Sequence, residues 1–309
     1  MQNNMKLYLT RSISVVIPSY QRYNEVLRAV NSVLNQTLPP LEVIVSNDGP
    51  DTKKSKLIES LNDKRVKYIE APHRCNASAT RNYGIKEARA DWVALLDDDD
   101  VWLPKKLELQ FYAFEQNCKN YAILAGVERI YNQSNKIWQR PKYIFQNGTN
   151  VQNVLFFPGG GVNTSTIVAP KRIFEEYSFN ENAERHEDWE WLLKAGQKLP
   201  VILTPEVICE RYLNSEKSLS RPGNYNYTLD WYLKNNKLMD SSTRGRFVSF
   251  ILSKKASYDR QFSALPWMFF ELIKNLSLTP KNISWLLLPW IFPVSFRQVL
   301  RKLISKRSF

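Results

Sequence analysis

The first hundred residues alternate short apolar runs with helix-like stretches, and this alternation constrains the fold more than any other feature of the sequence. Four apolar runs predict buried strands, because each is short and bounded by turn residues. Strands that alternate with helices are typical of an α/β fold built on a mainly parallel sheet. The predicted strands are 13–17, 41–45, 66–70 and 92–96, and the predicted helices are 24–34, 52–61 and 80–88.

Beyond residue 102 the pattern is less regular but still mixes both kinds of element. The chain has 309 residues, of which 43% are hydrophobic, so it can bury a substantial core. We expect an α/β domain over residues 1–220 and a helical extension over 221–309. Helices are predicted near 104–116 and 188–195, and short strands near 122–127 and 166–169.

Four consecutive aspartates, Asp97 to Asp100, directly follow the fourth predicted strand. In open α/β sheets, ligands bind outside the carboxyl ends of the strands. Carboxylates this close resist joint ionisation unless a cation neutralises them, and oxygen-only ligands suit Mg²⁺ or Mn²⁺. The run therefore predicts a divalent-ion site, with a solvated acidic turn as the alternative.

A second acidic pair, Glu187 and Asp188, stands at the start of the helix predicted at 188–195. A carboxylate facing the cation site could take the proton of an acceptor hydroxyl while that oxygen attacks. Asp188 is our candidate for this base. The alternative is helix capping, because acidic side chains in a first turn stabilise the helix dipole. His186 is interpreted as a surface residue.

Two further polar residues are candidates for contacts to a nucleotide. Asp48 could accept hydrogen bonds from a base, although Asn-Asp-Gly is also a common turn. Arg81 could bind a diphosphate through several donors, although an exposed helix arginine is the commoner case. The glycine run 159–161 lacks the lysine of a phosphate-binding loop, so it indicates a wall of an acceptor site or a plain loop.

Five motifs, taken in order, resemble the inverting glycosyltransferases of family 2, which have the GT-A fold. The resemblance covers about residues 12–215. It implies a donor-binding half at about 12–105 and an acceptor and base half at about 106–220. The processive synthases of this family carry Gln-x-x-Arg-Trp, which is missing here, so transfer of a single sugar is expected. The motifs are Ile13-Ser14-Val15-Val16-Ile17-Pro18-Ser19-Tyr20, Asn47-Asp48-Gly49, Ala79-Thr80-Arg81-Asn82-Tyr83-Gly84, Leu95-Leu96-Asp97-Asp98-Asp99-Asp100 and His186-Glu187-Asp188-Trp189.

The resemblance implies substrate contacts for five residues of the donor half. Pro18 and Tyr20 would line the nucleoside pocket, and Arg22 would add a substrate contact. Asp48 would read the base, and Arg81 would lie at the edge of the donor site. The implied donor is a nucleotide-sugar, with a UDP-sugar favoured.

The resemblance also implies the division of labour among the acidic residues. Asp98 would lie near the ribose, while Asp97 and Asp99 would hold Mn²⁺ or Mg²⁺ on the diphosphate. Asp188 would be the catalytic base, with Glu187 beside it. The implied acceptor is a saccharide or a lipid-linked saccharide, as in the assembly of bacterial surface polysaccharides.

The net charge of +13 is concentrated at the C-terminal end. Residues 211–309 hold 17 Lys and Arg against 5 Asp and Glu, which accounts for nearly all of the excess. The uncharged stretch 282–296 is too short and too interrupted by proline for a simple spanning helix. Basic and apolar residues then alternate at helical spacing over 297–307. We expect the extension to lie on an anionic membrane surface, with packing into the core or against a partner subunit as the alternative.

The remaining composition narrows the cellular setting. Cys75, Cys118 and Cys209 are widely separated, which argues against both a disulfide framework and a zinc site. No apolar run near the start has the length of a signal peptide. The expected location is therefore the cytoplasm, peripheral on the inner face of the cell membrane.

Two other classes of function stay open on the sequence alone. A nucleotidyltransferase acting on sugar phosphates also uses an α/β sheet and metal-bound phosphates, but usually has a glycine-rich signature after its first strand, and 18–22 contains no glycine. A non-catalytic module that binds membranes or polyanions would suit the basic charge but would leave the acidic run unexplained. No nucleic-acid partner is expected.

Overall fold

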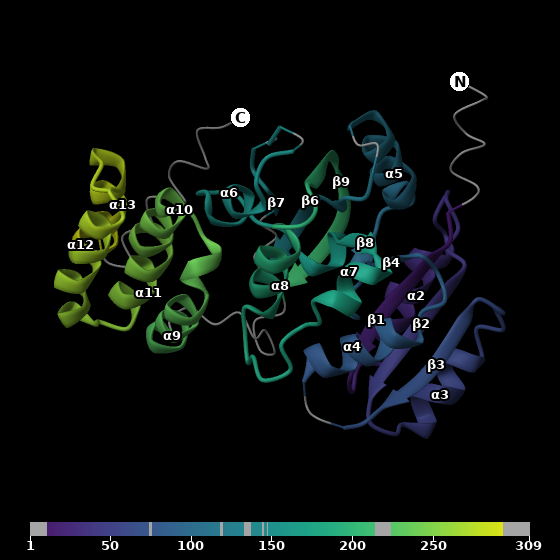
Figure 1. Ribbon diagram of the computed structural model, residues 1–309. Helices are drawn as coiled ribbons and strands as arrows, with labels where there is room; N and C mark the ends of the chain where they lie inside the picture. Colours follow the sequence, from purple (N-terminus) through teal and green to yellow (C-terminus); the bar gives the residue numbers. More distant parts are fainter. Residues whose placement is uncertain are drawn as a thin grey trace. The chain divides into compact units, whose positions relative to one another are not determined.

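The structure is a computed structural model that describes residues 11–73, 76–117, 120–132, 137–143, 145–146, 148–213 and 224–292. The chain divides into two compact units (Figure 1). Met1–Leu155 and Gly159–Ser218 form the first, which we name the sheet unit. Phe156–Pro158 and Leu219–Phe309 form the second, which we name the helical unit.

The sheet unit contains, in its described part, one nine-stranded mixed sheet with helices packed against it (Figure 1). Every strand and helix expected in the first hundred residues is present. The strands are β1 (Ile13–Ser19), β2 (Glu42–Asp48), β3 (Val66–Ala71), β4 (Trp92–Leu95), β5 (Val101–Trp102), β6 (Ile123–Asn132), β7 (Ile137–Arg140), β8 (Val168–Pro170) and β9 (Val201–Leu213). The helices are α2 (Asn24–Leu34), α3 (Thr52–Glu59), α4 (Ala77–Glu87), α5 (Lys106–Asn117), α6 (Val151–Phe156), α7 (Lys171–Glu176) and α8 (Glu187–Ala195).

The strand order is β3-β2-β1-β4-β8-β6-β9-β5, and β7 pairs with β6. The first four strands pair with one another in parallel, and β4 pairs with β8 in antiparallel orientation. Strands β1 and β2 are buried along their whole length, because helices cover both faces of this part of the sheet. Val15 packs in the core cluster that includes residues of α2 and α5, whereas the neighbouring Val16 faces α4. Successive side chains of a strand point to opposite faces, so α4 covers the face opposite to α2.

Parallel pairing brings the carboxyl ends of three strands to one edge of the sheet. Ser19 at the end of β1 lies opposite Asn47 of β2, and Val16 lies opposite Leu95 at the end of β4. The loop after β4 therefore starts beside the last residues of β1. Asp97 to Asp100 follow at this edge.

Strand β1 continues through Pro18 instead of stopping there as the sequence predicted. Val16 accepts a hydrogen bond from Leu96 N, so residues of the same parity direct their main-chain groups toward β4. Pro18 shares that parity but lies beyond the last residue paired with β4. Its missing N–H therefore costs no hydrogen bond of the sheet, and Pro18 can pair in register with Ser46 of β2.

The helical unit is built around aromatic side chains. Phe247 packs against Trp231 and Tyr232, with ring centroids 5.6 Å and 5.3 Å away. None of the described helices is long and apolar enough to cross a membrane. The basic stretch 297–307 lies outside the described residues. The helices are α9 (Tyr225–Asn235), α10 (Ser241–Arg246), α11 (Ser253–Tyr258), α12 (Leu265–Lys274) and α13 (Pro280–Ile291), with a π-helical segment at Phe247–Leu252.

Candidate active site

The turn after β1 is tied to the acidic run after β4 by one arginine. Arg22 Nη1 lies 2.6 Å from Asp98 Oδ1 and 2.8 Å from Asp99 Oδ2. Arg28 of α2 donates a further hydrogen bond of 2.9 Å to the main-chain oxygen of Asp99. The structure thus brings Arg22, Asp98 and Asp99 together, as expected for residues at one edge of the sheet.

Crowding and burial raise the pKa values of three of the four aspartates. Burial raises the pKa of Asp98 to about 6, with a further contribution from Asp99 and opposition from Arg22. Burial also raises the pKa of Asp99, and the charge of Asp97 adds to this effect. The pKa of Asp100 is raised well above its usual range, chiefly by burial, although Ser165 Oγ donates to its carboxylate at 2.6 Å. Added positive charge at this edge would therefore be stabilising.

The acidic run fits a divalent cation that is shared with a substrate. Among the described residues, no cluster of three or more His, Cys, Asp or Glu is arranged as a set of metal ligands. Mg²⁺ is commonly held by only one or two carboxylates, with phosphate oxygens and water completing its shell. The side chains of Asp97 and Asp99 are each 34% exposed. These two carboxylates thus supply the oxygen ligands that such a shared ion needs.

Tyr20 and Asp48 are joined by a histidine that the sequence analysis did not select. The Tyr20 ring is 44% exposed and stacks on His73, with ring centroids 5.4 Å apart. His73 Nδ1 lies 3.1 Å from Oδ1 of the buried Asp48 and 3.1 Å from its main-chain oxygen. The ends of β1 and β2 thus carry an exposed aromatic surface beside a carboxylate. Such a surface can stack on a nucleobase.

A buried lysine fixes the strand ends beneath this surface. Lys54 of α3 is fully buried, and its Nζ donates to Ser19 Oγ at 2.9 Å and to Asn47 Oδ1 at 2.7 Å. Burial lowers its pKa, although Asp98 and Asp51 oppose that effect. The sequence offered no signal for Lys54, because a lysine within a polar helix is normally exposed.

Arg81 of α4 connects the acidic run to the start of α8. Its Nη2 lies 3.0 Å from Asp97 Oδ1, and its Nη1 lies 3.9 Å from Glu187 Oε1. The side chain is only 3% exposed, and neither Nε nor Nη1 has a hydrogen-bond partner among the described residues. A buried guanidinium with two unused N–H groups can bind an anion strongly. Arg81 is therefore buried, and the alternative of an exposed helix arginine is wrong.

Asp188 lies in the first turn of α8, next to Glu187. Burial raises the pKa of Asp188 to about 7, and the neighbouring charge of Glu187 raises it further. Arg81 and Arg140 act in the opposite direction, and Trp189 N donates to Asp188 Oδ1 at 2.8 Å. This carboxylate can gain and lose a proton near neutral pH. The ring of His186 stacks on Trp189 at 4.1 Å.

Behind the acidic run lies a buried polar network that the sequence analysis missed. Asn163 Nδ2 donates to Asp100 Oδ2 at 3.1 Å and to Glu128 Oε2 at 2.8 Å. Arg211 Nε lies 2.9 Å from Glu128 Oε2. These residues come from β6, β9 and the loop before β8, and no local pattern relates them. Their role could be found only from the sheet order.

The glycine run packs on a half-buried arginine of β7. Arg140 Nε donates to the main-chain oxygen of Gly160 at 2.6 Å. A Cβ on Gly161 would lie 2.0 Å from Arg140 Nε, and its φ of +141° also favours glycine. The run is therefore a packed wall, and burial lowers the pKa of the arginine that it covers.

The chain is similar in sequence to known glycosyltransferases. The family model described as glycosyl transferase family 2 matches residues 14–178. WfgD of Escherichia coli, a UDP-Glc:α-D-GlcNAc-diphosphoundecaprenol β-1,3-glucosyltransferase, is 25% identical over 209 residues, which cover 67% of this chain and 79% of that protein. AmsB of Erwinia amylovora, an amylovoran biosynthesis glycosyltransferase, is 27% identical over 206 residues, covering 63% of this chain and 68% of AmsB. A glycosyltransferase of Rickettsia bellii is 31% identical over 235 residues, 74% of this chain, but the match spans only 33% of the Rickettsia protein.

The structure is similar to that of TarS from S. aureus, solved in complex with UDP-GlcNAc. The TM-score is 0.62 at 14% sequence identity, and the match covers 89% of this chain and 83% of the TarS chain. At this identity the likeness concerns the fold alone. It confirms the expected GT-A fold with additional C-terminal helices.

Proposed function

This chain belongs to glycosyl transferase family 2, as its five motifs indicated, and on that premise we propose that it transfers a single sugar from a nucleotide-sugar to a lipid-linked saccharide. The observation that carries the proposal is the position of Arg81 between Asp97 and Glu187. This contact puts the acidic run at the sheet edge and the start of α8 around the same guanidinium. Donor and base can therefore meet in one site.

The donor is a nucleoside diphosphate sugar, and we favour a UDP-sugar. Tyr20 stacks on the base, Asp48 accepts hydrogen bonds from it, and Pro18 lines the same pocket. Asp98, which is buried beside Arg22, accepts hydrogen bonds from the ribose hydroxyls. The two unused N–H groups of Arg81 bind the diphosphate.

Asp97 and Asp99 would hold a divalent cation, Mn²⁺ or Mg²⁺, on the diphosphate. When bound, that ion would neutralise the negative charge that develops on the departing nucleoside diphosphate. Burial and the charge of Asp97 raise the pKa of Asp99, which supports this assignment, because a cation offsets both effects. Arg22 is positioned to share in the same neutralisation.

Asp188 is the base of a single displacement. The acceptor oxygen attacks the anomeric carbon, the bond from that carbon to the diphosphate breaks, and the hydroxyl proton passes to the Asp188 carboxylate. The configuration at the anomeric carbon inverts. A pKa of about 7 supports this role, because a base is most effective when its pKa lies near the working pH. Glu187 assists by keeping that pKa raised.

The acceptor side of the proposal draws on two supports. WfgD acts on a diphosphoundecaprenol-linked sugar, and AmsB is a glycosyltransferase of amylovoran biosynthesis. The helical unit of this chain also exposes apolar side chains around the end of α12. Phe270, Ile273, Leu276 and Leu278 are 60%, 57%, 94% and 46% exposed. We therefore place the enzyme at the inner face of the cell membrane as a peripheral protein that takes a lipid-linked acceptor.

A donor screen tests the proposed function. The purified chain is incubated with UDP-, GDP- or dTDP-sugars, Mn²⁺ and GlcNAc-diphosphoundecaprenol, and the release of nucleoside diphosphate and the glycosylated lipid are measured. We expect release that requires metal and acceptor with one donor class, and Asp99→Ala should weaken metal-dependent donor binding. Release of pyrophosphate from a sugar phosphate and a nucleoside triphosphate would instead identify a nucleotidyltransferase. No turnover with any donor would contradict the proposal.

A further inference from the structure

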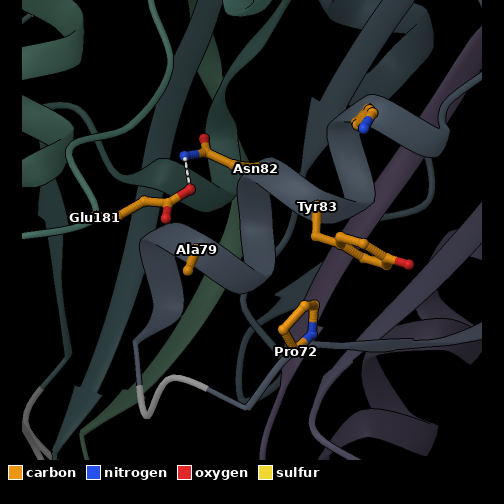
Figure 2. A pocket seen from close by; sticks show the side chains of 6 residues that line it. Pro72, Ala79, Asn82, Tyr83 and Glu181 are labelled. Atoms are coloured by element: carbon orange, nitrogen blue, oxygen red, sulfur yellow. Dashed lines mark hydrogen bonds between the residues drawn. The ribbon is translucent and has the colours of Figure 1, made fainter.

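Asn82 follows Arg81 in the third motif, and the reaction proposed above gives it no role. Its side-chain amide binds both main-chain groups of Phe179: Phe179 N donates to Asn82 Oδ1 at 3.0 Å, and Asn82 Nδ2 donates to Phe179 O at 2.9 Å. Nδ2 also donates to Glu181 Oε1 at 3.1 Å, as Figure 2 shows. A helix side chain thus pairs with an extended segment 97 residues away, much as a neighbouring strand would.

Phe179 is the point at which this pairing reaches the active site. Its ring is 1% exposed and lies between two residues of the site's framework. Arg81 Cζ is 4.8 Å from the ring centroid on one side, and the ring of Trp191 in α8 stacks at 5.5 Å. A shift of Phe179 would therefore move Arg81, α8 or both. Asp188 lies three residues before Trp191, in the first turn of the same helix.

Helix α4 provides a fixed base for this pairing. A Cβ on Gly84 would lie 2.6 Å from Val16 Cγ1, so the glycine lets the helix lie directly on β1. Asn76 caps the helix by accepting from Ser78 N at 2.7 Å and also donates to the main-chain oxygen of Glu181. The helix is thus held to the strand whose end binds the donor. Its motif contributes Arg81 to the site, Asn82 to the segment before α8, and Gly84 to the sheet.

We propose that Asn82 is a positioning residue for transfer, because it holds Phe179 so that α8 presents Asp188 to the acceptor hydroxyl while Arg81 contacts the donor side. The expected effect on sugar transfer rests on the proposed function, whereas the hydrogen bonds between Asn82 and Phe179 do not depend on it. The Asn82 amide carries an acceptor oxygen and a donor nitrogen, so it can accept from Phe179 N and donate to Phe179 O at once. Alanine removes both bonds, and aspartate keeps only the acceptor and brings a second carboxylate to Glu181.

A pocket of about 190 Å³ lies beside the pairing and supplies the control. Asn82 and Glu181 line it (Figure 2). Lys86, which is an exposed residue on the same helix as Asn82, lines it too. Lys86→Ala changes this pocket without touching Phe179. A difference between the Asn82 and Lys86 variants therefore reports on the pairing and not on the surface of α4.

The test compares Asn82→Ala with Lys86→Ala and the unchanged chain. Hydrogen exchange should become faster at the Phe179 amide and in the first turn of α8 in Asn82→Ala alone. With UDP-glucose and GlcNAc-diphosphoundecaprenol as probes, or the donor found in the screen, kcat should fall about tenfold or more, because small displacements of a catalytic group are costly. The Kd for UDP with Mn²⁺ should change much less than kcat, since the base and ribose contacts lie at the strand ends and, of the proposed donor contacts, Arg81 touches Phe179.

A paired variant keeps the inference testable if Asn82→Ala folds poorly. Asn82→Asp should lose kcat more severely than alanine, and adding Glu181→Gln should recover part of it, because the new amide can donate to the new carboxylate. Equal kcat in Asn82→Ala and Lys86→Ala, or unchanged exchange at Phe179, would overturn the inference. A chain that binds UDP and shows the exchange difference but transfers no sugar would contradict the proposed function instead.

Discussion

Asp188 illustrates how neighbouring charges set the chemistry of a single side chain. Burial and the adjacent Glu187 favour its protonated form, while Arg81 and Arg140 favour the carboxylate. The balance leaves its pKa at about 7. A change in any of these neighbours would move the pH range in which the base is ionised. Arg81 and Arg140 therefore keep the Asp188 carboxylate, which is the proposed base, available at neutral pH, although Glu187 lies beside it.

The pH dependence of transfer tests this balance. Because the base must be ionised, kcat should rise with pH through about 7 and then level off. Asp188→Asn should keep UDP binding and lose most of the transfer, at about a hundredfold or more. Near-normal transfer by this variant would remove Asp188 from the mechanism.

The same variant should be more stable than the unchanged chain at alkaline pH. A carboxyl whose pKa is raised by folding stabilises the protein while protonated, and this contribution is lost as pH rises through about 7. The loss begins above the usual carboxyl pKa of 3.8, so thermal melts at roughly pH 4 should nearly coincide, whereas at roughly pH 8 Asp188→Asn should melt a few degrees higher. Coincident melts at both pH values would show that folding does not raise the pKa of the Asp188 carboxyl.

Helix α4 shows how a whole element depends on one small residue. Gly84 lies against Val16 of β1 and Ser46 of β2, where an added Cβ would approach to 2.6 Å and 3.1 Å. Both neighbours are buried in the sheet and cannot move away freely. The helix itself carries Arg81 and Asn82, so its distance from the sheet sets the position of both.

Gly84→Ala should lower the free energy of unfolding by about 1–3 kcal/mol, the usual cost of overfilling a packed contact. Urea denaturation measures this, and Val16→Ala serves as the partner mutation because it removes the methyl group that the new Cβ would meet. The double variant should be more stable than the sum of the two single effects predicts. Strict additivity would show that the two side chains do not compete for the same space.

The elements near the start of the chain were predictable, whereas near the middle α5, β6, β8 and α8 were predictable and β7 and β9 were not. Residues 13–17 and 92–96 carry enough continuous apolar character to indicate buried strands, and Asp97 to Asp100 are conspicuous by charge alone. Strand β9 contains Pro205 and Glu206 and pairs with β6 through a register shift, so its sequence has no regular period. Strand β7 is an exposed edge. Tertiary pairing decides such strands, and local propensity does not.

The candidate site divides in the same way. Residues whose chemistry is concentrated locally, such as Asp99 and Asp188, could be selected from the sequence. Asn163, Glu128 and Arg211 could not, because each becomes notable only through partners that are 35 to 83 residues away. Burial decides their role, and burial here depends on the order of β6, β8 and β9.

The two units of the molecule carry different kinds of surface. The sheet unit holds the candidate site, while the helical unit combines exposed apolar residues with most of the excess positive charge. Parts of α12 and α13 do complete a core, since Met268, Leu272 and Leu286 are fully buried. Packing into the core thus accounts for one face of these helices, and their other face is exposed. The exposed face is the part that needs an occupant.

An anionic membrane suits that face, because Lys274 stands between Ile273 and Leu276 in the sequence and Lys281 follows them. Each lysine near a charged bilayer contributes about 1 kcal/mol to binding. Burying an aliphatic side chain adds about 1.5–3 kcal/mol. Replacing Ile273 and Leu276 by Glu should therefore weaken binding to phosphatidylglycerol vesicles about tenfold or more in a flotation assay, without altering UDP binding. Removal of 261–309 should abolish vesicle binding.

Leu41→Glu is the matched control, because Leu41 is 47% exposed in the sheet unit and should leave vesicle binding unchanged. Equal flotation of all variants would exclude this surface, and loss of self-association in place of flotation would make it a contact between copies of the chain.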